Sequence, residues 1–198
     1  LLIPAIVLGG IVSDATSEGQ EVSGIGGQFN FIEQAFALDG ARAILTLPAT
    51  RRSGGRLQSN ILWDHPHESV PRAYRDMVVT EYGVADLRGK RDEEVVKAML
   101  RVADSRFQQE LVAQAKKAGK LAQDFTLPPP WRRNTPEALA GWLRPKALPD
   151  FPFGTDFTPV DQSLLPALDR LSQAQGARAE MARLIWTGMR AGSAGAKP

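Results

Sequence analysis

The sequence predicts an α/β fold with an open, largely buried sheet flanked by helices, followed by a C-terminal helical extension. Three observations support this prediction. Short apolar segments of the kind found in buried strands alternate with amphipathic segments of helical period between residues 20 and 119. Glycines and prolines stand at the junctions between these segments. Soon after residue 120, three consecutive prolines mark a change of composition.

The first half of the predicted domain alternates strands with one helix. Residues 20–23 are expected to form a short strand that runs into a glycine-rich loop. The helix after this loop has Asn30 as its expected N-cap and Glu33 as the reciprocal capping partner. Two further short apolar segments predict buried strands, at residues 43–47 and 77–80.

The second half of the domain is predicted to be helical. Residues 92–103 place their apolar side chains on one face of a helix. Ser105 and Gln108 have the spacing of a capping box, which predicts a second helix that runs to about Gly119. The predicted domain therefore spans residues 1–120.

Residues 121–198 are predicted to form a proline-rich linker and a helical extension. The linker leads into a short helix that Asn134 or Thr135 is expected to cap, and residues 163–173 form one further amphipathic helix. Tryptophans are the expected anchors of this extension on a domain edge or a partner subunit, namely Trp131, Trp142 and Trp186.

Composition excludes several classes of site and partner. The chain has no cysteine, which excludes disulfides, thiolate nucleophiles and cysteine metal ligands and favours a cytoplasmic location. Its 24 basic and 22 acidic residues are dispersed without runs, so nucleic acid is not an expected partner. The apolar run at residues 1–12 is too short for a membrane span. Because the chain opens within this run and without an initiator methionine, we interpret it as the back part of a longer protein.

The glycine-rich loop is the first candidate site. Gly24, Gly26 and Gly27 would present bare backbone N–H groups at a helix N-terminus, where an anion or a developing oxyanion is stabilised. The dinucleotide fingerprint needs a glycine where Phe29 stands, and the phosphate-loop motif needs a lysine that is absent. The alternative is a tight turn without a ligand.

Glu81 is the second candidate, because it directly follows the predicted strand at residues 77–80 and precedes Gly83. Its carboxylate would lie at the carboxyl end of a strand, where open α/β sheets bind ligands. The alternative is an ordinary surface ion pair with a nearby cation: Arg75, Arg88 or Lys90. His65 and His67 suggest a metal site, but nothing near them completes a ligand set, and no metal is predicted.

Four segments together resemble the C-terminal domain of the acetyl-CoA hydrolase/transferase family, which belongs to the family I CoA-transferases. They are SGIGGQFNF, AILTLPAT, SNI and MVVTEYGVADLRGK, in that order, and the resemblance covers roughly residues 1–119. It implies a two-domain α/β enzyme that holds acyl-CoA at the domain junction. It also implies that a glutamate carboxylate attacks the thioester, and that this glutamate lies upstream of the residues in this chain.

The resemblance assigns roles to individual residues. Gly26 and Gly27 are expected to supply oxyanion donors, and Glu81 a supporting catalytic carboxylate. The expected substrate or CoA contacts are Gly24, Gln28, Asn60, Thr80, Gly83 and Arg56. Arg56 belongs to a basic, glycine-containing loop that would meet a CoA phosphate, and a solvated surface loop is the alternative. This chain has Asn30 where many members of the family have an aspartate, so the helix cap is kept and the charge is lost.

The resemblance also implies partners and a reaction. The expected partners are acyl-CoA and a small carboxylate, the protein's own N-terminal domain, and a second copy in a homodimer. Coenzyme A is a substrate, and no cofactor is expected. The predicted reaction of the full-length protein is acyl-CoA:carboxylate CoA transfer, or hydrolysis when water replaces the acceptor, and this chain alone is expected to be inactive. The alternative function is a noncatalytic α/β module that binds CoA or a protein partner.

Overall fold

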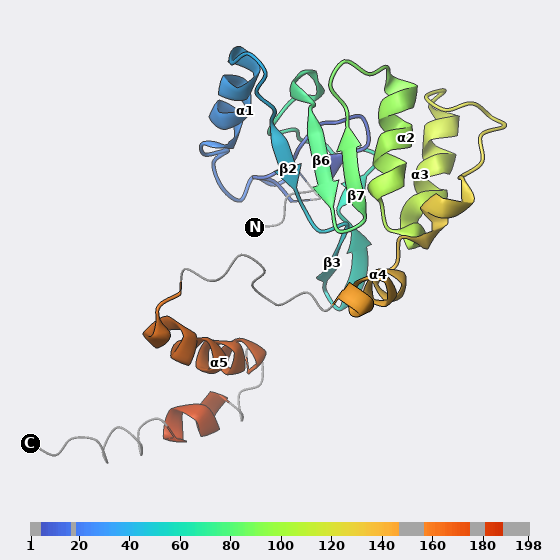
Figure 1. Cartoon of the computed structure of the whole chain (residues 1–198). Coiled ribbons are helices and arrows are strands. Elements are labelled where there is room, and N and C mark those ends of the chain that lie inside the picture. Colours follow the sequence, from blue (N-terminus) through green and yellow to red (C-terminus); the bar gives the residue numbers. More distant parts are fainter. Residues whose placement is uncertain (1–4, 17–18, 147–156, 175–180, 188–198) are drawn as a thin grey trace, which may run out of the picture. The chain divides into compact units, whose positions relative to one another are not determined.

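The computed structural model describes residues 5–16, 19–146, 157–174 and 181–187. By their contacts, residues 1–147 form one compact unit and residues 148–198 form a second. The first unit combines short strands with helices (Figure 1), so the α/β class predicted from the sequence is confirmed.

The described strands form three small sheets. Their bounds are β1 (Ala5–Ile6), β2 (Ile44–Thr46), β3 (Thr50–Ser53), β4 (Arg56–Ser59), β5 (Ile61–Leu62), β6 (Met77–Thr80) and β7 (Gly83–Asp86). β1 pairs in parallel with β5, and β3 pairs with β4 as an antiparallel hairpin. In the third sheet, of order β2-β6-β7, β2 is parallel to β6 and β7 is antiparallel to it. The two predicted apolar strands are therefore confirmed as β2 and β6.

The strand predicted at residues 20–23 is wrong. Glu21 makes a single isolated bridge with Ala15, and the N–H of Val22 donates to the carbonyl oxygen of Asp14 at 2.7 Å. The hydrogen bonds of this segment therefore return to the preceding turn of the chain. Because no neighbouring strand receives them, the segment that leads to the glycine loop is itself a loop.

The β2-β6-β7 sheet has one buried face and one open face among the described residues. Leu45, Val78 and Ala85 stand in register across the three strands and face the hydrophobic core. Ile44 and Val84 project from the opposite face and are 59% and 50% exposed. The predicted burial of the sheet therefore holds for the core face alone.

Helices α2 (Asp92–Val102) and α3 (Ser105–Lys117) complete the core (Figure 1). α2 packs against β6 and β7, and α3 packs against α2. The buried side chains of α2 are Val95, Val96, Met99, Leu100 and Val102. Both predicted helices are confirmed, and the second is terminated by Gly119, which has a φ of 67°.

The capping box predicted for α3 is wrong. Asp104 is the N-cap, and its carboxylate accepts a hydrogen bond from the backbone N–H of Arg106 at 3.0 Å. Gln108 is buried instead of exposed at the helix start. Its side-chain amide donates to the carbonyl oxygens of Leu100 at 2.8 Å and Trp131 at 2.9 Å. Gln108 therefore ties α2 and the segment after residue 128 to α3.

Helix α1 (Gln28–Ala37) begins two residues before its predicted N-cap. Gly26 has a φ of 64°, and Gly27 then takes helical dihedrals of −78° and −4°. This glycine turn starts the helix early, so Asn30 lies in the first turn and its predicted capping role is wrong. No residue of α1 is buried.

Residues 122–146 belong to the first unit. Their elements are η2 (Pro129–Arg133), α4 (Pro136–Leu143) and η3 (Arg144–Lys146). Thr135 caps α4, whereas the side chain of Asn134 donates to the carbonyl oxygens of Arg101 and Ala103 at 2.7 and 2.8 Å. Trp131 packs against the core of its own chain. Of the two predicted places for this side chain, a domain edge or a partner subunit, the structure thus supports the contact within the chain.

The second unit contains helix α5 (Pro159–Gln173), which begins four residues before its predicted start and is capped by Thr158. Residues 181–187 are also helical. Trp142, in α4 of the first unit, is 62% exposed, and Trp186 is 57% exposed. The sequence also predicts a turn-rich stretch at residues 150–159, of which residues 150–156 lie outside the described residues.

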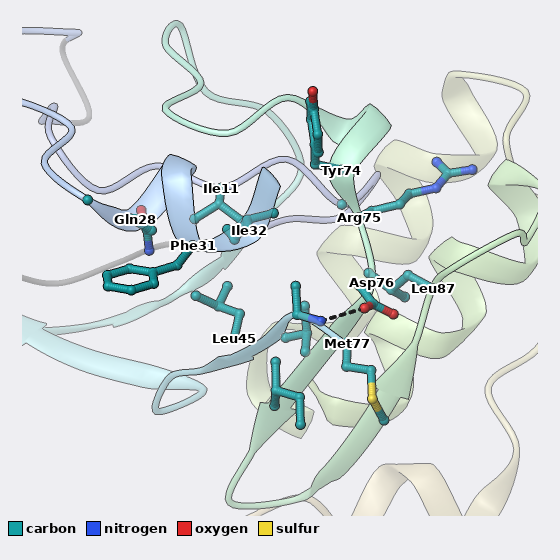
Figure 2. A pocket seen from close by; sticks show the side chains of 15 residues that line it. Ile11, Gln28, Phe31, Ile32, Leu45, Tyr74, Arg75, Asp76, Met77 and Leu87 are labelled. Carbon is teal, nitrogen blue, oxygen red and sulfur yellow. Dashed lines mark hydrogen bonds between the residues drawn. The ribbon is translucent and has the colours of Figure 1, made fainter. Parts of the chain in front are cut away.

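One buried carboxylate joins the three strands of the central sheet. Asp76 precedes β6 and accepts hydrogen bonds from Arg42 Nε at 2.7 Å, the Ala43 backbone N–H at 2.6 Å and Arg88 Nη2 at 2.6 Å. Figure 2 shows its bond to the start of β2. The backbone N–H of Leu87 donates to the Asp76 carbonyl oxygen at 2.6 Å, which fixes the end of β7.

We expect Asp76→Asn to destabilise the first unit by roughly 3 kcal/mol, because the partly exposed guanidinium groups of Arg42 and Arg88 lose the charge of their buried partner. Asp124→Asn is the control, since Asp124 is exposed, and it should change stability by less than about 0.5 kcal/mol. Urea unfolding at pH 7 measures both. Equal stability of the two variants would show that Asp76 is dispensable.

Candidate functional site

Glu81 lies at the carboxyl end of β6, in the two-residue turn to β7, as predicted. Its Oε2 accepts a hydrogen bond from the backbone N–H of Ala49 at 2.7 Å. Ala49 is buried and lies just beyond the end of β2. Because β2 and β6 are parallel, their carboxyl ends meet at this point. Gly83 closes the turn with a φ of 147°, which a side chain would strain.

The alternative ion pairs considered for Glu81 are wrong. The three cations in question bind other carboxylates: Arg75 pairs with Asp92, Lys90 with Asp86, and Arg88 with Asp76. The second carboxylate oxygen of Glu81 accepts no hydrogen bond from the described residues. One carboxylate oxygen of Glu81 is therefore fixed by a hydrogen bond, and the other is available to accept one.

Asn60 binds the segment of Pro48 and Ala49, whose Ala49 N–H is bound by Glu81. It is fully buried, and its side-chain amide donates to the Pro48 carbonyl oxygen at 2.8 Å. Its Oδ1 accepts from Arg51 Nη1 at 2.7 Å, and its backbone N–H donates to the Ala49 carbonyl oxygen at 2.9 Å. The structure thus brings Asn60 and Glu81 together on the two sides of one peptide segment.

The turn that carries Glu81 is fixed to the helices behind it. The Thr80 hydroxyl donates to the Val102 carbonyl oxygen at 2.8 Å, and the Tyr82 hydroxyl donates to Asp104 Oδ2 at 3.0 Å. Arg106 donates to both Asp104 oxygens, at 2.8 and 2.7 Å. Burial raises the pKa of Tyr82, which keeps the hydroxyl protonated as a donor. Thr80 is buried and anchors the turn through its hydroxyl.

A cavity of about 620 Å³ adjoins Glu81. The β6–β7 turn and the adjoining strand residues line one side of the cavity, with Val79, Thr80, Glu81, Tyr82, Gly83 and Val84. The segment after residue 132 lines the other side, with Arg133, Asn134, Ala138, Leu139 and Trp142. The sequence did not indicate that Arg133, Leu139 or Trp142 would lie beside Glu81. The one signal in the sequence is the aromatic side chain of Trp142, which predicts an anchor on a domain edge or on a partner subunit.

The glycine loop is exposed. A Cβ at Gly26 would meet no atom within 4 Å, although the positive φ of this residue would be strained with a side chain. Gly27 has an ordinary φ, and a Cβ there would lie 3.3 Å from Phe31 Cε2. Gly24 is also free of close neighbours. The residue that requires glycine for its backbone is therefore Gly26.

A second cavity, of about 430 Å³, separates α1 from the sheet (Figure 2). Its apolar wall includes Phe31, Ile32, Leu45, Met77 and Val78, and its rim includes Gly27 and Gln28. α1 is held beside it by edge-to-face contacts of Phe29 and Phe36 with the Tyr74 ring, at 5.1 and 5.5 Å. The buried Oε1 of Gln28 has no partner among the described residues.

The predicted site residues therefore fall into separate groups. The cavity beside the glycine loop and the cavity beside Glu81 share no lining residue. Arg56 stands in the β3–β4 hairpin, after a turn in which Gly54 and Gly55 have φ values of 56° and 75°, and it lines neither cavity. Its contact with a CoA phosphate stays a prediction.

The two histidines make short contacts with neighbouring polar groups, and within the described residues His67 Nε2 has a nearby carboxylate but no hydrogen bond. His65 Nδ1 lies 2.8 Å from the His67 carbonyl oxygen, and His67 Nε2 lies 3.0 Å from Asp14 Oδ1. Ser69 also donates its hydroxyl to Asp14. This cluster supports the loop before the glycine motif, because the Asp14 carbonyl oxygen receives the Val22 N–H. The described residues contain no group of three or more side chains that could hold a metal ion.

Residues 5–115 match the acetyl-CoA hydrolase/transferase C-terminal domain, so the chain belongs to this family. The similarity extends to individual CoA-transferases. The chain is 34% identical over 101 residues to a probable butyrate:acetyl-CoA coenzyme A-transferase of Syntrophomonas wolfei, covering 50% of this chain and 23% of that protein. It is 35% identical over 99 residues to a 4-hydroxybutyrate coenzyme A transferase of Clostridium kluyveri, with the same coverage.

A solved structure shares the fold of the matched region. The crystal structure of RipA from Yersinia pestis superposes with a TM-score of 0.54 and 28% identity, over 60% of this chain and 27% of that one. The chain thus spans about a quarter of the length of the relatives that it matches. Within the described residues, no helix is long and apolar enough to cross a membrane.

Asp104→Asn should reveal how the Glu81 turn is held. Burial alone would raise the pKa of Asp104, but hydrogen bonds from Arg106 and Tyr82 outweigh it and place the pKa below its ordinary value of 3.8. The folded state then binds fewer protons than the unfolded state in acid, so the stabilisation is complete above that value and is lost as the pH falls through the lowered pKa.

We therefore expect the wild type to exceed Asp104→Asn by roughly 2 kcal/mol at pH 7 and by progressively less below pH 4. Asparagine still caps a helix, so the comparison isolates the charge. Urea unfolding from pH 2 to pH 7 measures the difference. A difference that does not change with pH would contradict an ionised Asp104 in the folded state.

Proposed function

We propose that this chain is the C-terminal part of an acyl-CoA:carboxylate CoA-transferase or acetyl-CoA hydrolase. The observation that carries the proposal is the Glu81 carboxylate, anchored to the Ala49 N–H at the joint carboxyl ends of β2 and β6. Ligands of open α/β sheets bind at this edge. The CoA-transferase relatives, matched over the domain that contains Glu81, supply the substrate class.

The nucleophile in this proposal is a glutamate upstream of the chain. Its carboxylate oxygen attacks the thioester carbonyl carbon and expels the CoA thiolate, which leaves an acyl-glutamyl anhydride. The thiolate then attacks the glutamyl carbonyl carbon and releases the acyl group as a carboxylate. The acceptor carboxylate reverses these two steps, and water in its place gives hydrolysis. Exclusion of water decides between transfer and hydrolysis.

The residues of this chain support those steps. Each tetrahedral intermediate carries an oxyanion, and the exposed glycine loop at the N-terminus of α1 leaves backbone N–H groups free to donate to it. Gly26 and Gly27 are proposed as these donors. Glu81 is proposed to position the nucleophile or the CoA chain, because its hydrogen bond with Ala49 fixes one oxygen and directs the other.

The open face of the sheet is the proposed contact with the rest of the enzyme. Ile44 and Val84 are exposed apolar residues on the two outer strands of the sheet, β2 and β7, which is unfavourable unless another part of the protein covers them. The N-terminal domain of the same enzyme is the proposed cover. A homodimer, a cytoplasmic location, and acyl-CoA with a small carboxylate as substrates complete the proposal.

Glu81→Gln in the full-length enzyme should slow the reaction about 100-fold while the covalent glutamyl-CoA adduct still forms, because glutamine keeps the bond to Ala49 and loses the charge. The adduct is trapped with hydroxylamine and mapped by mass spectrometry. An adduct on Glu81 itself in the wild type would make Glu81 the nucleophile and would overturn its supporting role.

Gly26→Ala should lower both stability and rate. The positive φ of Gly26 makes alanine unfavourable by about 1 kcal/mol, and a displaced oxyanion donor lowers kcat by about 100-fold. Gly40→Ala is the matched control, because Gly40 has a φ of 71° and open space but lies beyond the far end of α1. It should show the same loss of stability with full turnover. Equal turnover of both variants would show that the glycine loop is structural.

A further inference from the structure

A third cavity, of about 380 Å³, lies at the amino-terminal side of β6; it shares Arg75 with the second cavity and no lining residue with the cavity beside Glu81. Four of its eight lining residues are cations and one is an acid: Phe36, Arg72, Ala73, Arg75, Arg88, Gly89, Lys90 and Asp92. It contains no residue of the glycine loop and no residue of the Glu81 turn. In Figure 2, the guanidinium of Arg75 points away from Phe31 and Leu45, the apolar residues of the second cavity.

The carboxylates near this cavity do not neutralise its cations. The ion pairs of this network join six cations to three carboxylates: Arg42 and Arg88 to Asp76, Arg42 and Lys90 to Asp86, and Arg72, Arg75 and Lys120 to Asp92. Three positive charges are therefore left uncompensated within the network. The lowered pKa of Asp92, for which the hydrogen bond from Lys120 is the main cause, keeps its single carboxylate ionised and fully engaged.

Arg72 is the cation with most capacity to bind a ligand. Its side chain is 55% exposed, and its one ion pair is a distant contact of 3.8 Å with an oxygen of Asp92 that Lys120 already contacts at 2.7 Å. Lys90 is also partly exposed, and its shortest bond goes to the Asp86 carbonyl oxygen at 2.5 Å. Both side chains therefore retain N–H groups that can turn toward an anion in the cavity.

The framework of the cavity is rigid. Arg75 donates to the carbonyl oxygens of Leu8 and Lys90, at 3.2 and 2.6 Å, and Arg88 stacks on the Phe36 ring at 4.3 Å while it binds Asp76. These bonds fix two guanidinium groups before any ligand arrives, which lowers the entropic cost of binding.

We propose that this cavity is a binding site for a phosphate group. Arginine guanidinium groups match the geometry of phosphate oxygens, and the uncompensated charge favours a dianion over a singly charged carboxylate. The phosphate can be inorganic phosphate or the 3′-phosphate of coenzyme A, which share this chemistry. The site differs from the basic β3–β4 hairpin in which Arg56 is predicted to meet a CoA phosphate, because Arg56 does not line this cavity.

The test uses the full-length protein and the acylation rate of Lys90 by an N-hydroxysuccinimide ester, mapped by mass spectrometry. Lys117, which is exposed at the end of α3, is the internal control. Inorganic phosphate should slow acylation of Lys90 several-fold in a saturable manner and leave Lys117 unchanged at constant ionic strength. Equal effects on the two lysines, or no effect on Lys90, would overturn the site.

Two variants distinguish a built site from general attraction. Arg72→Gln should raise the phosphate concentration for half-protection by at least about fivefold, and Arg101→Gln, an exposed arginine of α2 outside the cavity, should leave it unchanged. Circular dichroism and the Tm confirm that both variants are folded. Equal shifts in both variants would contradict the proposal.

Coenzyme A and dephospho-coenzyme A identify the source of the phosphate. Protection by coenzyme A at lower concentration than by its dephospho form assigns the site to the 3′-phosphate, whereas protection by inorganic phosphate alone assigns it to the free ion, and either result supports the site. The proposal does not depend on CoA transfer. An active transferase in which Lys90 is unprotected would overturn this site and leave the proposed function standing.

Discussion

The buried carboxylate of Asp76 is the contact on which the central sheet depends. A two-residue or three-residue parallel pair gains little stability from its own hydrogen bonds, and β2 and β6 are paired over three residues. Asp76 adds bonds to Arg42, to the backbone of Ala43 and to Arg88. Burying an ionised carboxylate is costly without such partners, so the arrangement is favourable only when all three are in place.

This constraint reaches the candidate site through the register of the strands. Asp76 aligns the starts of β2 and β6, and the two strands are so short that their ends are aligned as well. Ala49 is thereby placed within hydrogen-bond distance of Glu81, and Asn60 closes the same segment from the opposite side. The geometry of the candidate site at Glu81 is thus set by Asp76 and its hydrogen-bond partners at the other end of the sheet.

The segment after residue 121 is held to the domain by more specific contacts than its proline-rich composition indicates. The side-chain amides of Gln108 and Asn134 donate hydrogen bonds to backbone carbonyl oxygens of neighbouring segments. These bonds hold α3 and η2 against the core. α4 consequently forms one wall of the cavity at Glu81. The region that carries the family's sequence pattern ends at residue 115, so this wall is built by residues outside that pattern.

Local patterns in the sequence determined the class of fold, the strands β2 and β6, the helices α2 and α3, and the position of Glu81 at a strand end, because apolar period and strand–turn spacing are properties of neighbouring residues. The same reasoning gave an incorrect cap at Asn30 and an incorrect capping box at Ser105 and Gln108, since a cap depends on where the chain turns and on which distant carbonyl groups compete for the side chain. Tertiary structure alone decided that Glu81 binds the Ala49 N–H instead of a nearby arginine, and that Arg72 and Lys90 share a cavity. Partners of opposite charge are abundant in the sequence, and only the folded chain selects which of them come within reach.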